Sequence, residues 1–371
     1  MGNWRNGELG NFITLKRGFD LPQQKREDGQ VPIFSSSGIT GTHSTAMVNA
    51  PGVITGRYGT IGEVFYAAED FWPLNTTLFV EDFHGNDAKF IYYFLKTLEW
   101  SKFTSASAVP GINRNTVHKE TVSLPDIETQ RRIASTLSML DEKIKTNTEI
   151  NDNLEQQAQS YFQELFVDNA SPEWTTGTIS DLGTVVGGST PSKAKPEYYT
   201  ESGIAWITPK DLSINKSKFV SHGENDITEL GLKNSSAVIM PEGTVLFSSR
   251  APIGYIAIAA GEVTTNQGFK SVVPKPEIGT PFVYFFLKNT LPVIEGMASG
   301  STFKEVSGST MKNVPAVIPD AETLAKFSDF CAAIFAQQRT LEEQNQSLAK
   351  LRDSLLPKLM SGEIDVSAVH L

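Results

Sequence analysis

The sequence has one cysteine, Cys331, among its 371 residues, so it forms no disulfide within the chain and no cysteine-rich metal site. No apolar run reaches the ~18 residues of a membrane span. The opening residues 1–6 lack the apolar stretch of a secretory signal, and Asn6 stands where a myristoylation signal has Ser or Thr. Glycine (29) and proline (19) are at ordinary levels, which excludes collagen-like and disordered chains. We expect a soluble, cytoplasmic protein with no membrane partner.

Basic residues are also in short supply, because 32 Lys and Arg face 42 Asp and Glu and the net charge is −10. This balance argues against a stand-alone, non-specific nucleic-acid binder, which is normally basic. It leaves room for local basic patches, or for an assembly in which other subunits carry the positive charge. At this length, with 39% apolar residues, two or three domains can each bury a core.

What the chain does contain is an internal duplication. Five pairs of segments resemble each other, and the first pair is offset less than the others, so the second copy carries roughly twenty extra residues. We expect most of these extra residues within 196–213. The five pairs are 4–10 with 174–183, 57–62 with 250–254 (one gap), 75–79 with 266–270, 90–96 with 282–288, and 122–126 with 316–320.

Each copy has the pattern of a mixed α/β domain followed by a long helix. Short apolar runs at 53–55, 78–80, 244–247 and 255–259 predict strands. The aromatic segments 90–96 and 282–288 predict short amphipathic helices. The long helices show a heptad seam, and seven of the ten seam positions of the second are apolar. The predicted seams are 133, 137, 140, 144, 147, 151, 154, 158, 161, 165 and 327, 331, 334, 338, 341, 345, 348, 352, 355, 359.

A helix of ~35 residues is about 50 Å long and cannot bury its seam alone. The two long helices therefore pack on each other, most simply antiparallel, and the second ends near Pro357 or Gly362. The predicted fold class is α+β, with two repeated α/β domains separated by two antiparallel coiled-coil helices in a circular, pseudo-twofold organisation. The predicted boundaries are 1–126, 127–167, 168–318 and 319–371.

Asn151 and Asn345 occupy equivalent seam positions. A buried Asn in a helix seam fixes register at a cost in stability. One hypothesis is that these two residues meet near the pseudo-twofold axis and set the register of the helices. The alternative is that both are simply solvated.

A rigid spacer that holds two similar but unlike domains suits a target with two unlike half-sites, as in dimeric DNA-binding proteins. Three motifs are LPDIETQRRI (124–133) leading into LDEKI (140–144), SLLPKLMSGEI (354–364), and GGSTPS (187–192) followed by IAWITPKDL (204–212). With these motifs, the whole chain resembles the specificity (S) subunit of type I restriction–modification systems. The second Pro319-Asp320 copy lacks the QRRI continuation, which weakens the prediction of its helix start.

This resemblance implies that each domain is a target recognition domain for one half of a split, asymmetric site in double-stranded DNA. It implies that the helices set the spacing and dock two methyltransferase subunits, which use S-adenosylmethionine to methylate an adenine extruded from the duplex. Nuclease/translocase subunits, which use ATP and Mg²⁺, are a further partner in assemblies that also restrict DNA. The chain itself is then non-catalytic and holds no cofactor.

Arg57 and Arg250 lie in matching Gly-rich turns, where an arginine can bond guanine bidentately or bind a phosphate. The alternative is an arginine that braces the turn. For Tyr58 the choice is between a phosphate contact and packing, and for the lysines a solvated surface is the default. Gln267 has an amide that can pair with adenine, and the alternative is a buried amide that satisfies the end of a strand. The segment 111–114, which ends in Arg114, resembles a loop near DNA in the family, and Lys304, after 301–303, is its counterpart in the second copy. The predicted DNA-binding set is Arg57, Tyr58, Arg114, Lys193, Lys210, Arg250, Gln267 and Lys304.

Catalytic alternatives fail on the residues present. Asp126 with Asp141 and Lys143 imitates a Mg²⁺-nuclease pattern, but the second copy lacks it and Asp141 lies along a continuous helix. The chain has no glycine-rich S-adenosylmethionine motif, no Asn-Pro-Pro-aromatic motif, no Walker A motif and no metal spacing among its five histidines. Cys331 falls on the seam and is predicted to be a core thiol. The remaining alternative is a coiled-coil scaffold that presents two ligand-binding domains without DNA.

Overall fold

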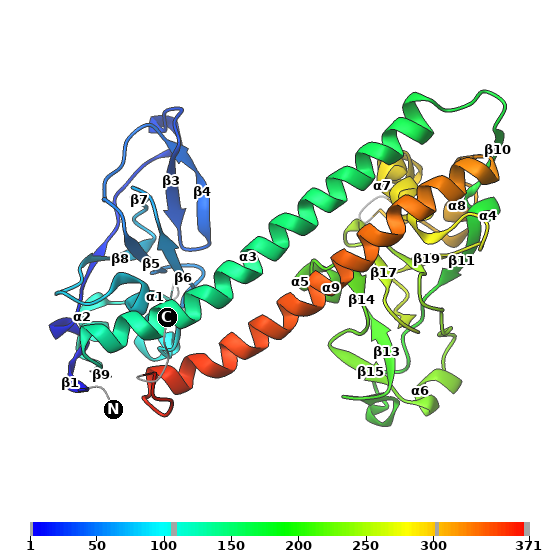
Figure 1. Cartoon of the computed structure of the whole chain (residues 1–371). Helices are drawn as coiled ribbons and strands as arrows, with labels where there is room; N and C mark the ends of the chain where they lie inside the picture. The colour runs from blue at the N-terminus through cyan, green and yellow to red at the C-terminus, as the bar shows by residue number, and fades with distance from the viewer. Residues whose placement is uncertain (1–2, 105–109, 301–303, 367–371) are drawn as a thin grey trace. The chain divides into compact units, whose positions relative to one another are not determined.

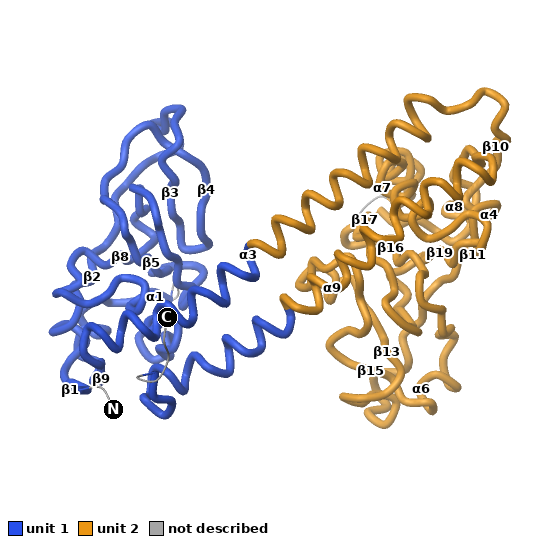
Figure 2. Tube along the Cα trace, viewed as in Figure 1, with its two compact units in different colours: residues 1–145, 346–371 blue, residues 146–345 orange. Residues whose placement is uncertain are grey.

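The computed structural model describes residues 3–104, 110–300 and 304–366, which form two compact units (Figure 2). Unit 1 contains residues 1–145 and 346–371, and unit 2 contains residues 146–345. Every helix in the described residues is too short or too polar to cross a membrane.

Unit 1 is built on a four-stranded sheet of order β2-β8-β5-β6, with a three-stranded sheet β4-β3-β7 and a ribbon β1-β9 beside it (Figure 1). Its helices are α1 (Ala88–Lys96), α2 (Arg114–His118), the first part of α3 (Ile127–Gln163) and the end of α9 (Ala321–Met360). Its strands are β1 (Arg5–Glu8), β2 (Thr14–Arg17), β3 (Val31–Ser35), β4 (Gly38–His43), β5 (Gly52–Gly56), β6 (Val64–Ala67), β7 (Trp72–Pro73), β8 (Thr77–Asp82) and β9 (Thr121–Leu124).

Unit 2 repeats this plan with additions. Its main sheet has the order β11-β19-β16-β17-β14, beside a sheet β12-β15-β13-β18 and a ribbon β10-β20. Its strands are β10 (Thr175–Thr178), β11 (Gly183–Gly187), β12 (Tyr199–Thr200), β13 (Ile204–Ile207), β14 (Phe219–Val220), β15 (Asn225–Ile227), β16 (Val245–Ser249), β17 (Ile253–Ala259), β18 (Thr264–Thr265), β19 (Lys270–Pro274) and β20 (Pro315–Ile318). Its helices are the second part of α3, α4 (Ile179–Leu182), α5 (Pro209–Ile214), α6 (Glu229–Lys233), α7 (Thr280–Met297), α8 (Gly308–Lys312) and most of α9 (Ala321–Met360).

The duplication expected from the sequence is therefore present in the topology, but its extra residues lie elsewhere than predicted. Strands β3 and β5 are joined by residues 36–51, whereas the corresponding β13 and β16 are joined by residues 208–244. Strand β15 pairs with β13 as β4 pairs with β3, so the additional elements of this longer connection are α5, β14 and α6. The expectation of 196–213 was wrong, because β13 of the shared plan lies inside that range and most of the longer connection follows it.

The central strand of each main sheet is buried on both faces. In unit 1, Val53 of β5 belongs to the core beneath α1, and its neighbour Ile54 belongs to a second core under the small sheet. In unit 2, Val245 and Leu246 of β16 divide in the same way between two cores. Successive side chains of a strand point to opposite faces, so a short continuous apolar run suits a central strand. The predicted strands and the aromatic helices α1 and α7 are confirmed, although α7 is longer than predicted, with 18 residues.

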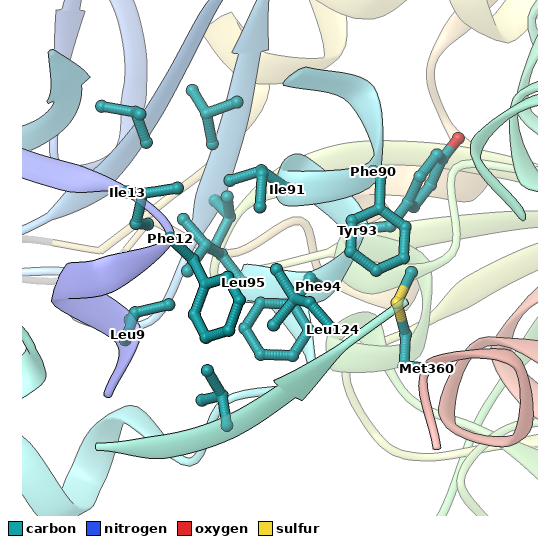
Figure 3. Packing of buried hydrophobic residues seen from close by; sticks show 14 of the residues in the cluster. Leu9, Phe12, Ile13, Phe90, Ile91, Tyr93, Phe94, Leu95, Leu124 and Met360 are labelled. Atoms are coloured by element: carbon teal, nitrogen blue, oxygen red, sulfur yellow. The ribbon is translucent and has the colours of Figure 1, made fainter. Parts of the chain in front are cut away.

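In both units the aromatic helix is packed against the long helices. Figure 3 shows Phe90, Tyr93 and Phe94 of α1 close to Met360 at the end of α9 in unit 1. In unit 2 the ring of Phe162 in α3 lies 5.8 Å from those of Phe282 in α7 and Phe327 in α9. Each fully buried aromatic side chain of this kind contributes about 1.5–3 kcal/mol.

The long helices run in opposite directions within each unit. In unit 2, Asn147 contacts Asn345, and further along the pair Phe162 contacts Phe327. In unit 1, the carboxylate of Asp141 accepts a hydrogen bond from Arg352 at 2.8 Å. All ten predicted seam positions of each helix are buried or half-buried. A π-helical turn, Glu164–Asp168, follows α3, and α9 ends at Met360 with Pro357 inside it.

Both long helices begin at a Pro-Asp pair. Asp126 accepts a hydrogen bond from the Thr129 amide at 2.9 Å, and Asp320 does the same for Thr323 at 2.9 Å. The second helix therefore starts at Ala321 although it lacks the QRRI continuation. In the first copy, Gln130 of that continuation is fully buried and donates to Asn86 at 2.8 Å, which ties the start of α3 to the loop before α1.

Candidate nucleic-acid interface

In unit 1, Arg57 and Tyr58 lie where β5 ends, and Arg114 follows the segment 111–112 that is bonded to them. The Arg57 carbonyl accepts a hydrogen bond from the Ile112 amide at 3.0 Å, and its guanidinium lies 4.5 Å above the Tyr58 ring. Tyr58 bridges to Gly111, and a β-carbon at Gly111 would lie 2.2 Å from the Tyr58 ring, so this position requires glycine. Arg114, exposed at the start of α2, reaches the Leu15 carbonyl at 3.4 Å.

Unit 2 has the same turn after β16. The Ser249 amide donates to Gly268 at 2.7 Å, and the Val306 amide donates to the Ser249 carbonyl at 3.0 Å. Arg57 makes the corresponding bonds in unit 1, to Thr76 and from Ile112. The hydrogen-bond pattern therefore aligns Arg57 with Ser249.

It follows that Arg250 corresponds to Tyr58. The sequence pairing of Arg57 with Arg250 was wrong by one residue, because it matched the residue types and placed the gap afterwards. Both arginines still lie at the same end of the same sheet in their own units.

Arg250 belongs to a group of polar side chains. Its guanidinium lies 3.5 Å from the Glu305 carboxylate, which is also 3.8 Å from the Lys270 ammonium. Gln267 accepts a hydrogen bond from the Thr190 hydroxyl, and its carbonyl accepts one from Lys270 at 3.3 Å. Desolvation lowers the pKa of Lys270, which opposes the effect of Glu305.

The other lysines of the predicted set lie on segments next to this group. Lys193 is exposed, three residues beyond Thr190. Lys210 is exposed on α5, and its neighbour Pro209 packs on Gly268. Lys210 already has a partner, because it donates to Glu224 at 2.6 Å, and this hydrogen bond raises its pKa.

The predicted loops are described only in part. Lys304 is exposed and adjoins Glu305, while residues 301–303 lie outside the described residues. Residues 105–109 of the loop before Arg114 also lie outside them. Sequence reasoning missed Lys270 and Glu305, although Lys270 ends one of the duplicated segments, where a charged residue at the start of an apolar strand is a usable signal.

The two seam asparagines do not pair as predicted. Asn345 accepts a hydrogen bond from Asn147 at 2.9 Å, and Asn151 donates to the Gln338 carbonyl at 3.4 Å. The hypothesis that Asn151 meets Asn345 was wrong, because the register of the helices places Asn147, one seam step earlier, opposite Asn345. The alternative of simple solvation also fails for this pair, since both residues are bonded across the seam.

Unit 2 also contains a buried ionic network that no sequence motif predicted. Lys218, 6% exposed, lies 2.8 Å from the Glu155 carboxylate on α3 and donates to Gln338 on α9 at 3.0 Å. Lys288 of α7 contacts the same Glu155 at 2.5 Å. Burial lowers the pKa of Lys218 to about 8, while attraction to the two lysines overcomes burial and holds the pKa of Glu155 below its usual value.

Comparison with known proteins identifies the family of this chain. The family model of the type I restriction modification DNA specificity domain matches residues 1–156 and again residues 172–350. The chain belongs to this family. The two matches coincide with the two copies of the duplicated plan.

Individual relatives carry the same description. The MjaIX specificity subunit of Methanocaldococcus jannaschii is 38% identical over 192 residues, 51% of this chain and 44% of the relative, so the match spans less than half of that protein. The HindI specificity subunit of Haemophilus influenzae is 24% identical over 347 residues, 72% of this chain and 75% of the relative. A crystal structure of the S subunit from M. genitalium matches with a TM-score of 0.66 at 18% identity, over 96% of both chains, and shows the shared fold.

The family is one of DNA recognition, and its specificity subunits are non-catalytic. A role in DNA specificity follows for this chain from its membership. The roles of individual residues and the partners of the chain are taken up below.

Proposed function

We propose that this chain is the DNA-specificity subunit of a type I restriction–modification complex, in which each unit recognises one half of a bipartite, asymmetric site. The observation that carries the proposal is the duplicated turn. One plan occurs twice, and equivalent positions hold Tyr58 with Gly111 in unit 1 and Arg250 with Glu305 in unit 2. Equal folds with unlike side chains at their turns suit two unlike half-sites.

Arg57, Arg250 and Gln267 are proposed to reach base edges. An arginine bonds guanine and an amide bonds adenine in the major groove. Arg114, Lys193, Lys210 and Lys304 are proposed to contact phosphates, and Tyr58 to support Arg57. Phosphate contacts orient the protein, while base contacts give specificity.

The long helices are proposed to act as an antiparallel coiled coil that sets the distance between half-sites, with recognition domains 1–126 and 168–318 and helical regions 127–167 and 319–371. Polar seam contacts such as Asn147 with Asn345 support a role in register. The helices are also proposed to dock two methyltransferase subunits. With a net charge of −10, the chain is expected to leave much of the phosphate clamp to these partners.

The chemistry is assigned to those partners. S-adenosylmethionine would bind the methyltransferase, and ATP with Mg²⁺ the nuclease/translocase subunits, while this chain binds no cofactor. Such an assembly works on chromosomal DNA, and so in the cytoplasm.

The test is co-expression with the methyltransferase subunit encoded beside this chain, followed by long-read mapping of methylated adenines. A split asymmetric motif is expected. Replacing residues 168–318 by the same region of another specificity subunit should change one half of that motif and leave the other. A stable complex with no methylated motif, or no DNA binding with any partner, would contradict the proposal and favour a DNA-independent scaffold.

A further inference from the structure

The positive charges at the two turns are carried by different elements. Strand β2 pairs with β8 as β11 pairs with β19, and the final residue pairs are Arg17 with Leu78 in unit 1 and Gly187 with Lys270 in unit 2. Arg17 on β2 of unit 1 thus corresponds to Gly187 on β11 of unit 2. Leu78 on β8 of unit 1 corresponds to Lys270 on β19 of unit 2.

The short helices α2 and α8 show the same exchange. Each begins after a side chain that caps it, Asn113 in unit 1 and Ser307 in unit 2. The next residue is Arg114 in unit 1 and Gly308 in unit 2. Unit 2 therefore lacks the arginine that unit 1 has at this point.

Lys270 fills the place left by these two glycines. A β-carbon at Gly187 or at Gly308 would lie 3.9 Å from the Lys270 Cδ, so the lysine stem lies over both. The side chain is 15% exposed, and its ammonium donates to the Gln267 carbonyl at 3.3 Å and lies beside the Glu305 carboxylate. Its separation of 3.8 Å from Glu305 is longer than a well-formed charged hydrogen bond, so this contact is a weak one.

We propose that Lys270 is a DNA-backbone contact of unit 2 and supplies from β19 the cation that Arg114 supplies from α2 in unit 1. The inference rests on the proposed function. A lysine ammonium acts as a point charge, which suits a phosphate better than a bidentate base contact. Lys270 then contributes affinity to the second half-site and no preference for sequence.

The experiment uses the complete complex with methyltransferase subunits and a duplex that carries the mapped motif. Lys270→Met keeps the stem and removes the charge. It should weaken DNA binding about tenfold at low salt, reduce the slope of log K against log salt by about 1, and leave the methylated motif unchanged. Lys233→Met, which removes an exposed lysine of α6 in the same unit, is the matched control and should bind like the wild type.

A relocated charge provides the decisive variant. Gly308 has space for a β-carbon, because its nearest neighbours are the Lys270 stem atoms at 3.9 Å. Lys270→Met combined with Gly308→Arg should return the dissociation constant to within about threefold of the wild type and restore the salt slope. Gly308→Arg alone should increase the slope by about 1, and this readout does not depend on how well the Lys270 variant folds.

Two results would overturn the inference. One is a Lys270→Met complex with wild-type affinity and salt slope. The other is a loss that Gly308→Arg does not restore and that comes with a changed motif, because Lys270 would then act through Arg250 and Glu305. A wild-type complex that binds no specific site would instead contradict the proposed function, and it is measured first.

Discussion

The two units of this chain close the same turn with different chemistry. In unit 1, the ring of Tyr58 lies on Gly111, and in unit 2 the equivalent positions hold Arg250 and Glu305, 3.5 Å apart. Two backbone hydrogen bonds are shared: the amides of Arg57 and Ser249 donate to Thr76 and Gly268, and their carbonyls accept from Ile112 and Val306. The comparison teaches that one backbone plan for the turn can present different side chains in the two units.

The units also differ in how their aromatic helix is joined to the long helices. In unit 1, the Tyr93 hydroxyl donates to Asp141 at 2.5 Å, and Asp141 pairs with Arg352, which is 23% exposed. In unit 2, Glu155 is shared by Lys218 and Lys288, and Lys218 is only 6% exposed. A partly solvated ion pair therefore joins the aromatic helix to the long helices in unit 1, and a buried ionic network joins them in unit 2.

The largest expected effect comes from breaking the buried network. Glu155→Gln leaves Lys218 without its anion in a buried site, and should reduce the stability of unit 2 by about 3–5 kcal/mol. Asp141→Asn in unit 1 should cost about 1 kcal/mol, because its pair with Arg352 is partly solvated. Amide hydrogen exchange of α7 and α1 measures the two units separately. Glu142→Gln, an exposed control on α3, should stay within about 0.5 kcal/mol; equal losses for Glu155 and Asp141 would refute the distinction.

The next effect separates the two turns. Arg57→Ala and Arg250→Ala each remove a proposed base contact, which is worth about 1–3 kcal/mol of discrimination. Each variant should therefore relax the methylated motif in one half only, and the two halves should differ. Long-read methylation mapping provides the measurement. If both variants relaxed the same half, the assignment of one half-site to each unit would be wrong.

A smaller effect concerns pH and unit 2. The pKa of Lys218 is lowered to about 8 in the folded state, whereas that of a lysine in the unfolded chain is near 10.4. Between these two pH values the unfolded chain therefore holds a proton that the folded chain has released. Stability should therefore rise with pH in this window, by about 1 kcal/mol between pH 8 and pH 9. The measurement is the difference in unfolding free energy between wild type and Lys218→Met at both pH values. This difference cancels the opposing effect of Cys331, whose pKa burial raises to about 12.

The stability of α1 in unit 1 is the internal reference for that experiment. This helix is joined through Tyr93 to the pair of Asp141 and Arg352, and the arginine stays charged between pH 8 and pH 9. A gap between wild type and variant that is the same at pH 8 and pH 9 would show that Lys218 does not titrate there.

The smallest effect sharpens the account of the helix seam. Asn147 is fully buried and bonded to Asn345, so replacing both by leucine exchanges a polar pair for apolar contact. We expect unit 2 to gain about 1 kcal/mol and the helices to lose some specificity of register. Thermal unfolding and exchange of α9 amides report both changes. A lower melting temperature would contradict this prediction.

Local sequence patterns predicted much of the fold. The seven-residue spacing located both seams, whose positions are all buried or half-buried, because a helix repeats its environment at that interval. The runs around Val53 and Val245 located the central strands, because a strand covered on both faces is apolar throughout. The family motifs led to the family that the comparisons show.

Register and distant contacts were predicted poorly. Matching residue types aligned Arg57 with Arg250, whereas the hydrogen bonds align it with Ser249. The extra residues of unit 2 were expected before α5 ended, yet the longer connection runs over 208–244. A one-residue shift leaves composition almost unchanged, and only strand pairing reveals it.

The sequence by itself determined the duplicated plan, the long seamed helices and the family, because each depends on residues repeated at fixed spacing. The tertiary structure decided which cations share a turn and which polar groups are buried together. Lys270 lies over Gly187 and Gly308, and Lys218 meets Glu155 across 63 positions of the chain. Such contacts depend on how strands pair and helices pack, so no local pattern carries them.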